Sequence, residues 1–231
     1  MHIDVLPDAA AAAHAAAAFI ADRARAAIRE RGRFLCALSG GETPRPMLAA
    51  LAREPLPWEH IDVFQTDERV APAGSEARNL THLERLLVTP AALPAARLHA
   101  MPVEADNLAT AAATHAQVLL DAAGAPPVFD LVHLGLGVDG HTASLFAGDA
   151  ALEVDDAWVA ATGSYHGYRR MTLTLPTLER ARCVLWLVCG TAKAGVLARL
   201  CAGDDALPAG RVARDNAWVV TDDAAGRTCT P

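Results

Sequence analysis

The sequence predicts an α/β fold in one domain, with a mostly parallel sheet and helices on both of its faces. Apolar runs of strand length recur along the chain with longer helical stretches between them, and this alternation is typical of parallel sheets. Most of these runs lack strict alternation, as in strands that are buried on both faces. The 231 residues contain no linker-like stretch, so we expect residues 1–231 to form a single domain.

The elements can be assigned in chain order. The expected strands are residues 33–39, 61–66, 97–101, 129–137, 157–162, 170–175, 183–190 and 216–221. The expected helices are residues 9–31, 44–53, 76–88, 105–123 and 192–201. The first helix is rich in alanine, which loses the least entropy in a helix, and Asp8 is a suitable N-cap for it.

Composition excludes several classes of protein. The formal net charge of -7 argues against a nucleic-acid or anionic-membrane partner, because both attract a basic surface. We expect no signal peptide, because the N-terminus lacks a basic region followed by an apolar stretch, and no apolar run approaches the roughly 20 residues of a membrane span. The five cysteines have no metal-site spacing and indicate buried thiols in a reducing compartment. We therefore expect a cytoplasmic protein without a metal or other cofactor.

The run "FDLVHLGLGVDGHTASLFAG" contains Gly135, Gly137 and Gly140 in the spacing G-x-G-x-x-G. A dinucleotide site of that kind also needs an acidic residue at the end of the next strand. Here the acidic residues, such as Asp155, precede the next apolar run. The loop also carries Asp139 and His141, for which a pyrophosphate cradle has no use, so the pattern does not predict a dinucleotide site.

Ligands of parallel α/β sheets bind at the carboxyl ends of the strands, so the residues that follow each strand are the candidates. After the first run, Ser39, Gly40 and Gly41 lead to Thr43, a suitable helix N-cap. Free backbone N–H groups and a helix dipole would then attract a phosphate. The alternative is a turn that needs glycine only for its geometry.

The later strand ends supply charged groups. Asp67 and Arg69 follow the second run, and Asp139 and His141 follow the fourth. A histidine beside a carboxylate can be held in one tautomer and used for proton transfer near neutral pH. A solvated charged turn and a surface histidine are the corresponding alternatives.

Arg169 and Arg170 open a strand and could face an anion, although two adjacent arginines are usually exposed to solvent. Lys193 lies in the first turn of a helix. A cation is unfavourable there against the helix dipole. Lys193 is also the single lysine of a chain that otherwise uses arginine. A residue that breaks a local rule in this way indicates a ligand contact.

Together these segments resemble the 6-phosphogluconolactonase family and its relatives, the glucosamine-6-phosphate deaminases. The resemblance rests on the segments "LSGGETPRPM", "DERVAPAGSEARNL", "LGLGVDGHTASLFAG", "RMTLTLP", "VCGTAKA" and "LPAGRV". It implies a Rossmann-like α/β domain that binds no nucleotide. Arg78 stands where serine is usual and Ala147 where proline is common, and these departures affect only the expected loop conformations.

The resemblance also implies the roles of the candidate residues. His141 would be the general base, with Asp139 and Asp67 near the sugar carbons. The phosphate would be held by Ser39, Gly40, Gly41, Thr43, Arg170 and Lys193. Backbone N–H groups or Arg69 would stabilise the oxyanion. The implied substrate is the small-molecule lactone 6-phospho-D-glucono-1,5-lactone of the oxidative pentose phosphate pathway, and a monomer or small homo-oligomer is expected.

Two alternatives share the implied fold. A deaminase or isomerase of amino sugar phosphates places a glutamate seven residues after the loop aspartate, where this chain has Phe146. A non-catalytic sugar-phosphate sensor usually carries a basic DNA-binding domain, which this chain lacks, and has no need of Asp139 with His141. Ser144 lacks a G-x-S-x-G elbow and is expected to be a helix residue without a nucleophilic role.

Overall fold

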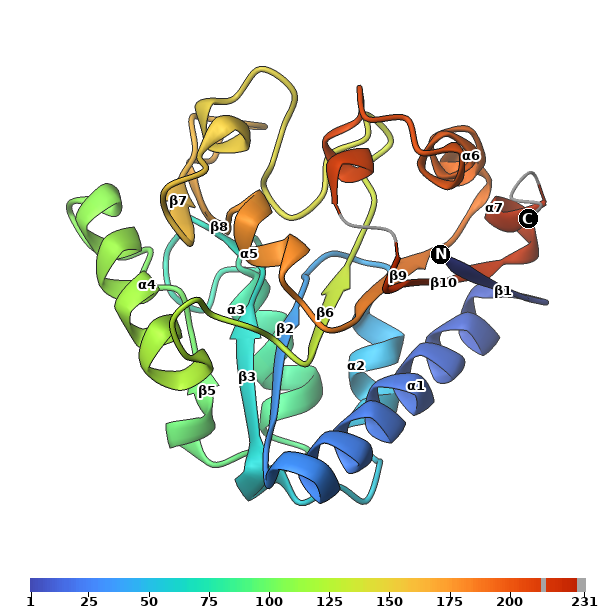
Figure 1. Ribbon diagram of the computed structural model, residues 1–231, viewed down its shortest axis with the longest axis horizontal. Coiled ribbons are helices and arrows are strands. Elements are labelled where there is room, and N and C mark those ends of the chain that lie inside the picture. The colour runs from blue at the N-terminus through green and yellow to red at the C-terminus, as the bar shows by residue number, and fades with distance from the viewer. Residues whose placement is uncertain (213–214, 228–231) are drawn as a thin grey trace.

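Seven strands form one parallel sheet in the order β1-β10-β9-β6-β2-β3-β5 (Figure 1). The computed structural model describes residues 1–212 and 215–227. The strands are β1 (His2–Leu6), β2 (Phe34–Leu38), β3 (Ile61–Gln65), β5 (Leu98–His99), β6 (Leu131–Leu134), β9 (Val184–Val188) and β10 (Ala217–Asp222). The helices are α1 (Ala9–Arg31), α2 (Arg45–Leu51), α3 (Asn79–Leu83), α4 (Leu108–Ala123), α5 (Leu175–Glu179), α6 (Ala194–Ala202) and α7 (Asp223–Gly226).

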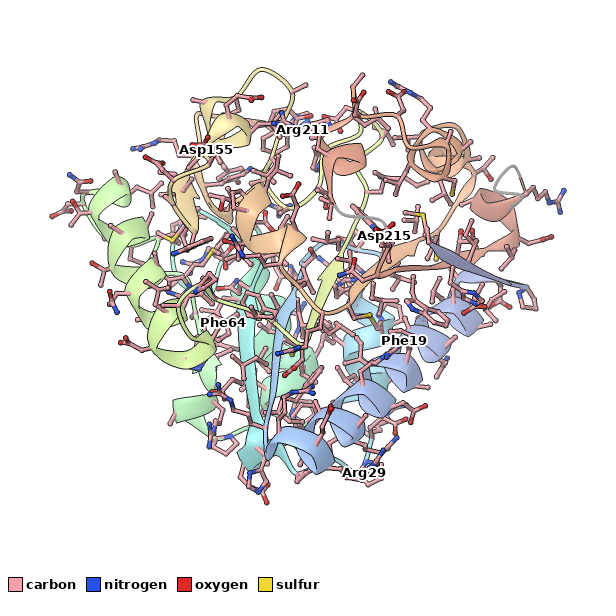
Figure 2. All side chains as sticks on the ribbon, in the orientation of Figure 1. Phe19, Arg29, Phe64, Asp155, Arg211 and Asp215 are labelled. Atoms are coloured by element: carbon pink, nitrogen blue, oxygen red, sulfur yellow. The ribbon has the colours of Figure 1, made fainter. Side chains whose placement is uncertain are left out.

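Each central strand contributes to two apolar cores because successive side chains point to opposite faces of a sheet. In β2, Phe34, Cys36 and Leu38 pack with α1 and α2. Leu35 and Ala37 pack in the other core, with α4 and α6. Side chains fill both layers, with Phe64 inside and Arg29 at the surface of α1 (Figure 2). The α/β fold with a parallel sheet and helices on both faces is confirmed.

Helix α1 begins and ends as its sequence requires. The carboxylate of Asp8 accepts a hydrogen bond of 2.8 Å from the backbone N–H of Ala11, which confirms the expected N-cap. Gly32 ends the helix with a φ of 76°, a conformation that favours glycine. Buried alanines such as Ala12 and Ala16 present little side chain to the sheet, so the helix can lie close to it.

A second sheet differs from the expectation. The strands β4 (Asp67–Arg69), β8 (Arg170–Leu173) and β7 (Val159–Ala161) form a separate antiparallel sheet in the order β4-β8-β7. The expected strands at 157–162 and 170–175 therefore do not join the parallel sheet. The charged triplet at 67–69 pairs with β8 and is not an exposed turn. Apolar content alone did not distinguish the two sheets, because both are largely buried.

Other local expectations also need correction. Strand β1 was not expected, because polar residues interrupt its short apolar pattern at the sheet edge. Cys36 and Cys183 are buried as expected, whereas Cys189 and Cys201 are only partly buried, and Cys229 lies outside the described residues. No helix among the described residues is long and apolar enough to cross a membrane.

Candidate functional site

A cleft of about 350 Å³ lies at the carboxyl ends of β2, β6 and β9, beside the second sheet. Among the residues that line it are most of those predicted from the sequence: Ser39, Gly40, Gly41, Thr43, Asp67, Arg69, His141, Arg170 and Lys193. Asp139 does not line the cleft but contacts His141. The structure thus brings together residues that lie far apart in the sequence, because parallel strands end at one edge of their sheet.

His141 and Asp139 form a close pair in the loop after β6. The Nδ1 atom of His141 lies 2.5 Å from Oδ1 of Asp139. A carboxylate at Nδ1 keeps the proton on that nitrogen and leaves the lone pair on Nε2. Burial lowers the pKa of His141, and the nearby Asp139 opposes this shift without reversing it. The imidazole is therefore neutral at neutral pH, and its side chain is 28% exposed.

Asp139 stays ionised. Burial opposes ionisation, but hydrogen bonds from Tyr165 and His141, together with the charge interaction with His141, lower the pKa of Asp139 to about 2. The hydroxyl of Tyr165 donates to Oδ2 at 2.7 Å, and His141 occupies Oδ1. Both oxygens of this carboxylate thus have a partner.

The glycines of this loop have separate functions. A Cβ on Gly137 would overlap the ring of His141 and the carboxylate of Asp139, so this glycine makes room for the pair. Gly140 has a φ of 88° and packs against Leu207. A Cβ on Gly135, which lines the cleft, would meet no atom within 4 Å. Of the three glycines of the motif, only Gly135 thus leaves open space at the cleft.

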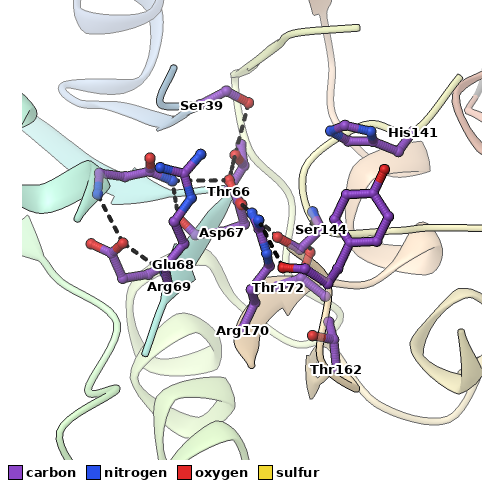
Figure 3. A network of polar contacts seen from close by, with 12 residues as sticks. Ser39, Thr66, Asp67, Glu68, Arg69, His141, Ser144, Thr162, Arg170 and Thr172 are labelled. Atoms are coloured by element: carbon purple, nitrogen blue, oxygen red, sulfur yellow. Dashed lines mark hydrogen bonds and ion pairs between the residues drawn. The ribbon is translucent and has the colours of Figure 1, made fainter. Parts of the chain in front are cut away.

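Asp67 lines the cleft and belongs to a network of polar contacts (Figure 3), in which its side chain is buried. Its Oδ2 accepts a hydrogen bond of 2.6 Å from Ser144 Oγ, and its Oδ1 accepts one of 3.2 Å from Thr66 Oγ1. Thr66 in turn lies 2.8 Å from the hydroxyl of Ser39. These contacts fix the carboxylate of Asp67. Ser144 lies in a turn, and not in a helix as expected.

Arg69 and Arg170 are directly opposite one another in the antiparallel pair of β4 and β8. Like charges in this position repel. Burial and the neighbouring Arg69 lower the pKa of Arg170, although Asp67 opposes the shift. The Nε atoms of both arginines are buried and have no partner among the described residues. An anion in the cleft would relieve this repulsion.

The turn after β2 differs in one detail from the expectation. Helix α2 begins at Arg45, and its cap residue is Pro44 and not Thr43 as expected. The helix has seven residues, so its dipole contributes little. Within the described part of the chain, no group accepts a hydrogen bond from the backbone N–H of Gly40 or Gly41. Gly41 has a φ of 108°, which requires glycine at this position.

Lys193 connects two walls of the cleft. Its Nζ donates a hydrogen bond of 2.6 Å to the carbonyl of Leu136, in the loop that carries His141. Burial lowers the pKa of Lys193, and the charge of Asp139 opposes this. The ammonium group has two further hydrogens to donate.

Three residues at the site were missed or misjudged from the sequence. Tyr165 contacts Asp139, Ser144 contacts Asp67, and Asn79 donates from Nδ2 to the backbone carbonyl of Asp67 at 3.0 Å. In the segment "SYHGYRR", two residues that end in glycine separate two tyrosines, which resembles the two-residue turn of a hairpin, and that pattern could have indicated Tyr165. The part of the chain that the structure describes contains no group of three His, Cys, Asp or Glu residues suited to hold a metal.

The fold and the cleft define a Rossmann-like α/β protein with a histidine–aspartate pair at the carboxyl edge of its sheet. The chain belongs to the family of glucosamine-6-phosphate isomerases and 6-phosphogluconolactonases, whose model matches residues 7–221. The resemblance seen in the sequence is thus confirmed.

Individual members of this family are similar to the chain over most of its length. The chain is 39% identical over 202 residues to a 6-phosphogluconolactonase of Synechocystis sp., covering 86% of this chain and 84% of the relative. It is 34% identical over 240 residues to a 6-phosphogluconolactonase of Mycobacterium tuberculosis, covering 97% of each. The crystal structure of a 6-phosphogluconolactonase from Thermotoga maritima has a TM-score of 0.86 at 28% identity, covering 96% of this chain and 98% of that one.

Proposed function

We propose that the protein hydrolyses 6-phospho-D-glucono-1,5-lactone to 6-phospho-D-gluconate, with His141 as the general base. The observation that carries the proposal is the 2.5 Å contact between His141 Nδ1 and Asp139 Oδ1 beside the cleft. This contact leaves Nε2 of a neutral imidazole to accept a proton. The names of the relatives supply the substrate.

The reaction needs one proton acceptor and a site for negative charge. His141 Nε2 takes a proton from water as the water oxygen attacks C1 of the lactone. The carbonyl oxygen becomes an oxyanion, which Arg69 or backbone N–H groups stabilise. The C1–O5 bond then breaks, and the protonated His141 gives its proton to O5. The product is the open-chain acid, which ionises at neutral pH.

The phosphate is assigned to the cationic side of the cleft. Arg170 and Lys193 line it together with the turn of Ser39, Gly40, Gly41 and Thr43. The mutual repulsion of Arg69 and Arg170 and the unpartnered N–H groups of the turn both favour an anionic ligand. Asp67, fixed by Ser144, lies close enough to Arg170 to orient it, at 3.9 Å.

Phe146 favours the lactonase over the deaminase. Its ring lies 4.7 Å from the ring of His141, at the position where the deaminases place a glutamate. A phenyl ring cannot relay a proton, so the ring-opening step of deamination lacks its partner. A lactone is already an activated ester and needs only a base for water.

The test is a coupled assay of lactone disappearance, corrected for spontaneous hydrolysis. His141→Ala should reduce kcat by at least about 10²-fold, which is the lower range for a general base. His60→Ala, which removes an exposed histidine, is the control and should retain wild-type turnover. Equal turnover by both variants would exclude His141 as the base. Ammonia release from glucosamine 6-phosphate at a comparable rate would instead favour the deaminase.

A further inference from the structure

Tyr165 is joined to the base through a single carboxylate. Its hydroxyl donates to Asp139 Oδ2 at 2.7 Å, and His141 Nδ1 lies 2.5 Å from Oδ1 of the same group. Tyr165 is not among the residues that line the cleft, and its hydroxyl contacts Asp139.

The backbone around Tyr165 is a tight hairpin. Tyr165 and Tyr168 form a bridge with N···O distances of 2.9 and 3.2 Å. His166 and Gly167, between them, have φ values of 48° and 79°, as a two-residue type I′ turn requires. The turn thus fixes where the side chain of Tyr165 leaves the backbone.

The ring of Tyr165 is fixed as well. It stacks on Phe146 with centroids 3.7 Å apart and an interplanar angle of 17°. The guanidinium of Arg170 lies 5.8 Å from the ring centroid, and its Nη2 donates to the backbone carbonyl of Tyr165 at 3.4 Å. The stack alone would be satisfied by phenylalanine, so the hydroxyl requires a separate explanation.

We propose that Tyr165 is a positioning residue, which acts through Asp139 to hold the imidazole of His141 neutral and correctly oriented. The hydroxyl takes part of the negative charge of Asp139, so the carboxylate attracts a proton to His141 less strongly. It also fixes the plane of the carboxylate, and thereby the direction of the bond to Nδ1. The part of the proposal that concerns rate rests on the proposed lactonase function.

Other charged groups also lie around His141. Asp67 from β4 favours its protonated form, whereas Arg170 from β8 disfavours it. Lys193, before α6, interacts with the charge of Asp139. The hydrogen bond to Asp139 raises the pKa of Tyr165, so the phenol remains a donor throughout the neutral range.

The test compares Tyr165→Phe with Tyr168→Phe. Tyr168 lies in the same hairpin, and its hydroxyl makes no hydrogen bond within the part of the chain described here. The pKa of His141 is measured by NMR of protein labelled in its histidine rings, with His141→Ala to assign the resonance. Tyr165→Phe should move this pKa upward by roughly half a unit to one unit, and Tyr168→Phe should leave it unchanged. Equal pKa values in the two variants would overturn the proposal.

Two further measurements distinguish a failure of this proposal from a failure of the proposed lactonase function. The acid limb of kcat/KM for lactone hydrolysis should move upward with the pKa of His141 in Tyr165→Phe. Absence of lactone hydrolysis by the wild type would overturn the proposed function but leave the NMR test intact. If Tyr165→Phe does not fold, the phenol itself is titrated by NMR: its pKa should fall in Asp139→Asn, and an unchanged value would refute the link.

Discussion

The side chain of Asn79 occupies the space in which residue 40 would carry its Cβ, so the bare backbone of Gly40 lies directly against an amide. This contact joins the turn after β2 to the start of α3. Asn79 in turn donates to the backbone carbonyl of Asp67 at 3.0 Å. The absence of a side chain at Gly40 therefore determines the position of a group that holds Asp67.

Gly40→Ala should displace Asn79 and lower both stability and activity. Insertion of a methyl group into a packed site costs about 1–3 kcal/mol, measured by urea denaturation. The loss of kcat/KM in Gly40→Ala should exceed the loss in a variant that is destabilised by the same amount at a position away from the cleft. Gly195→Ala is the control, because it lies in α6 with no atom within 4 Å of a Cβ. That change should stabilise the protein by up to about 1 kcal/mol, and a similar gain in Gly40→Ala would contradict the packing argument.

Removal of a cation from the cleft should weaken binding of the phosphorylated lactone. We expect Lys193→Met and Arg170→Ala each to cost about 1.5–3 kcal/mol of binding, the range for a charge-assisted hydrogen bond. KM is measured for the phosphorylated lactone and for glucono-1,5-lactone. Only the first should rise, and Arg29→Ala, at an exposed position, should change neither. Wild-type KM in both cleft variants would place the phosphate elsewhere.

Arg78 has a structural function that the sequence did not indicate. Its side chain is 1% exposed, and its Nε lies 3.2 Å from Oε2 of the fully buried Glu68. Glu68 also accepts hydrogen bonds from the backbone N–H groups of Arg69, Asn79 and Leu80. Glu68 thus provides acceptors for the backbone N–H groups at the start of α3, and Arg78 compensates the negative charge of Glu68. The departure from the family pattern at this position lies in the interior and not in an exposed loop.

Arg78→Ser should therefore destabilise the protein by about 3 kcal/mol, at the lower end of the cost of removing one partner of a buried ion pair. The lower end applies because Glu68 keeps its other donors. The double variant Arg78→Ser with Glu68→Gln should recover part of the loss, because the uncompensated charge is gone. Denaturation midpoints of the two variants test this. If the stability losses of the two substitutions simply add in the double variant, the prediction is wrong.

Stability should fall as the pH decreases from 7 to 5. Burial lowers the pKa of His133 to about 3 and that of His115 to about 4, from an ordinary value of 6.5. The unfolded chain thus binds more protons below pH 6.5, and each histidine removes up to about 1.4 kcal/mol per pH unit there. Above pH 6.5 this loss of stability is absent for both histidines. His133→Leu should reduce the slope of unfolding free energy between pH 6 and 5 by nearly one proton, and an unchanged slope would contradict this.

The sequence predicted the residues of the cleft better than the contacts between them. Strand ends can be located from apolar runs, and parallel strands deliver their ends to one edge, so His141, Asp67 and Lys193 could be grouped in advance. The contact of Ser144 with Asp67 spans 77 residues, and that of Tyr165 with Asp139 spans 26. Such contacts depend on loop conformations that tertiary packing decides, and local patterns do not encode them.

The division into two sheets was missed for a similar reason. β8 is buried at every residue, as the parallel strands β2, β3, β6 and β9 are. What separates it is its antiparallel partner β4, a three-residue strand made of the charged residues Asp67, Glu68 and Arg69. The charges are accommodated in a strand because Asp67 and Glu68 find buried hydrogen-bond partners.

The pairing of β1 with β10 has a consequence for how the chain folds. Val5 lies beside Thr221 in this edge of the sheet, so β1 meets its neighbour only after the long stretch of chain between them has been made. Closing so long a loop is slow, since contacts distant in sequence form late. During synthesis β2, β3 and β6 can assemble first, while β1 and the amino end of α1 await β10. Ribosome-bound chains that stop before residue 217 should therefore protect the centre of the sheet from proteolysis but leave residues 2–6 open to cleavage.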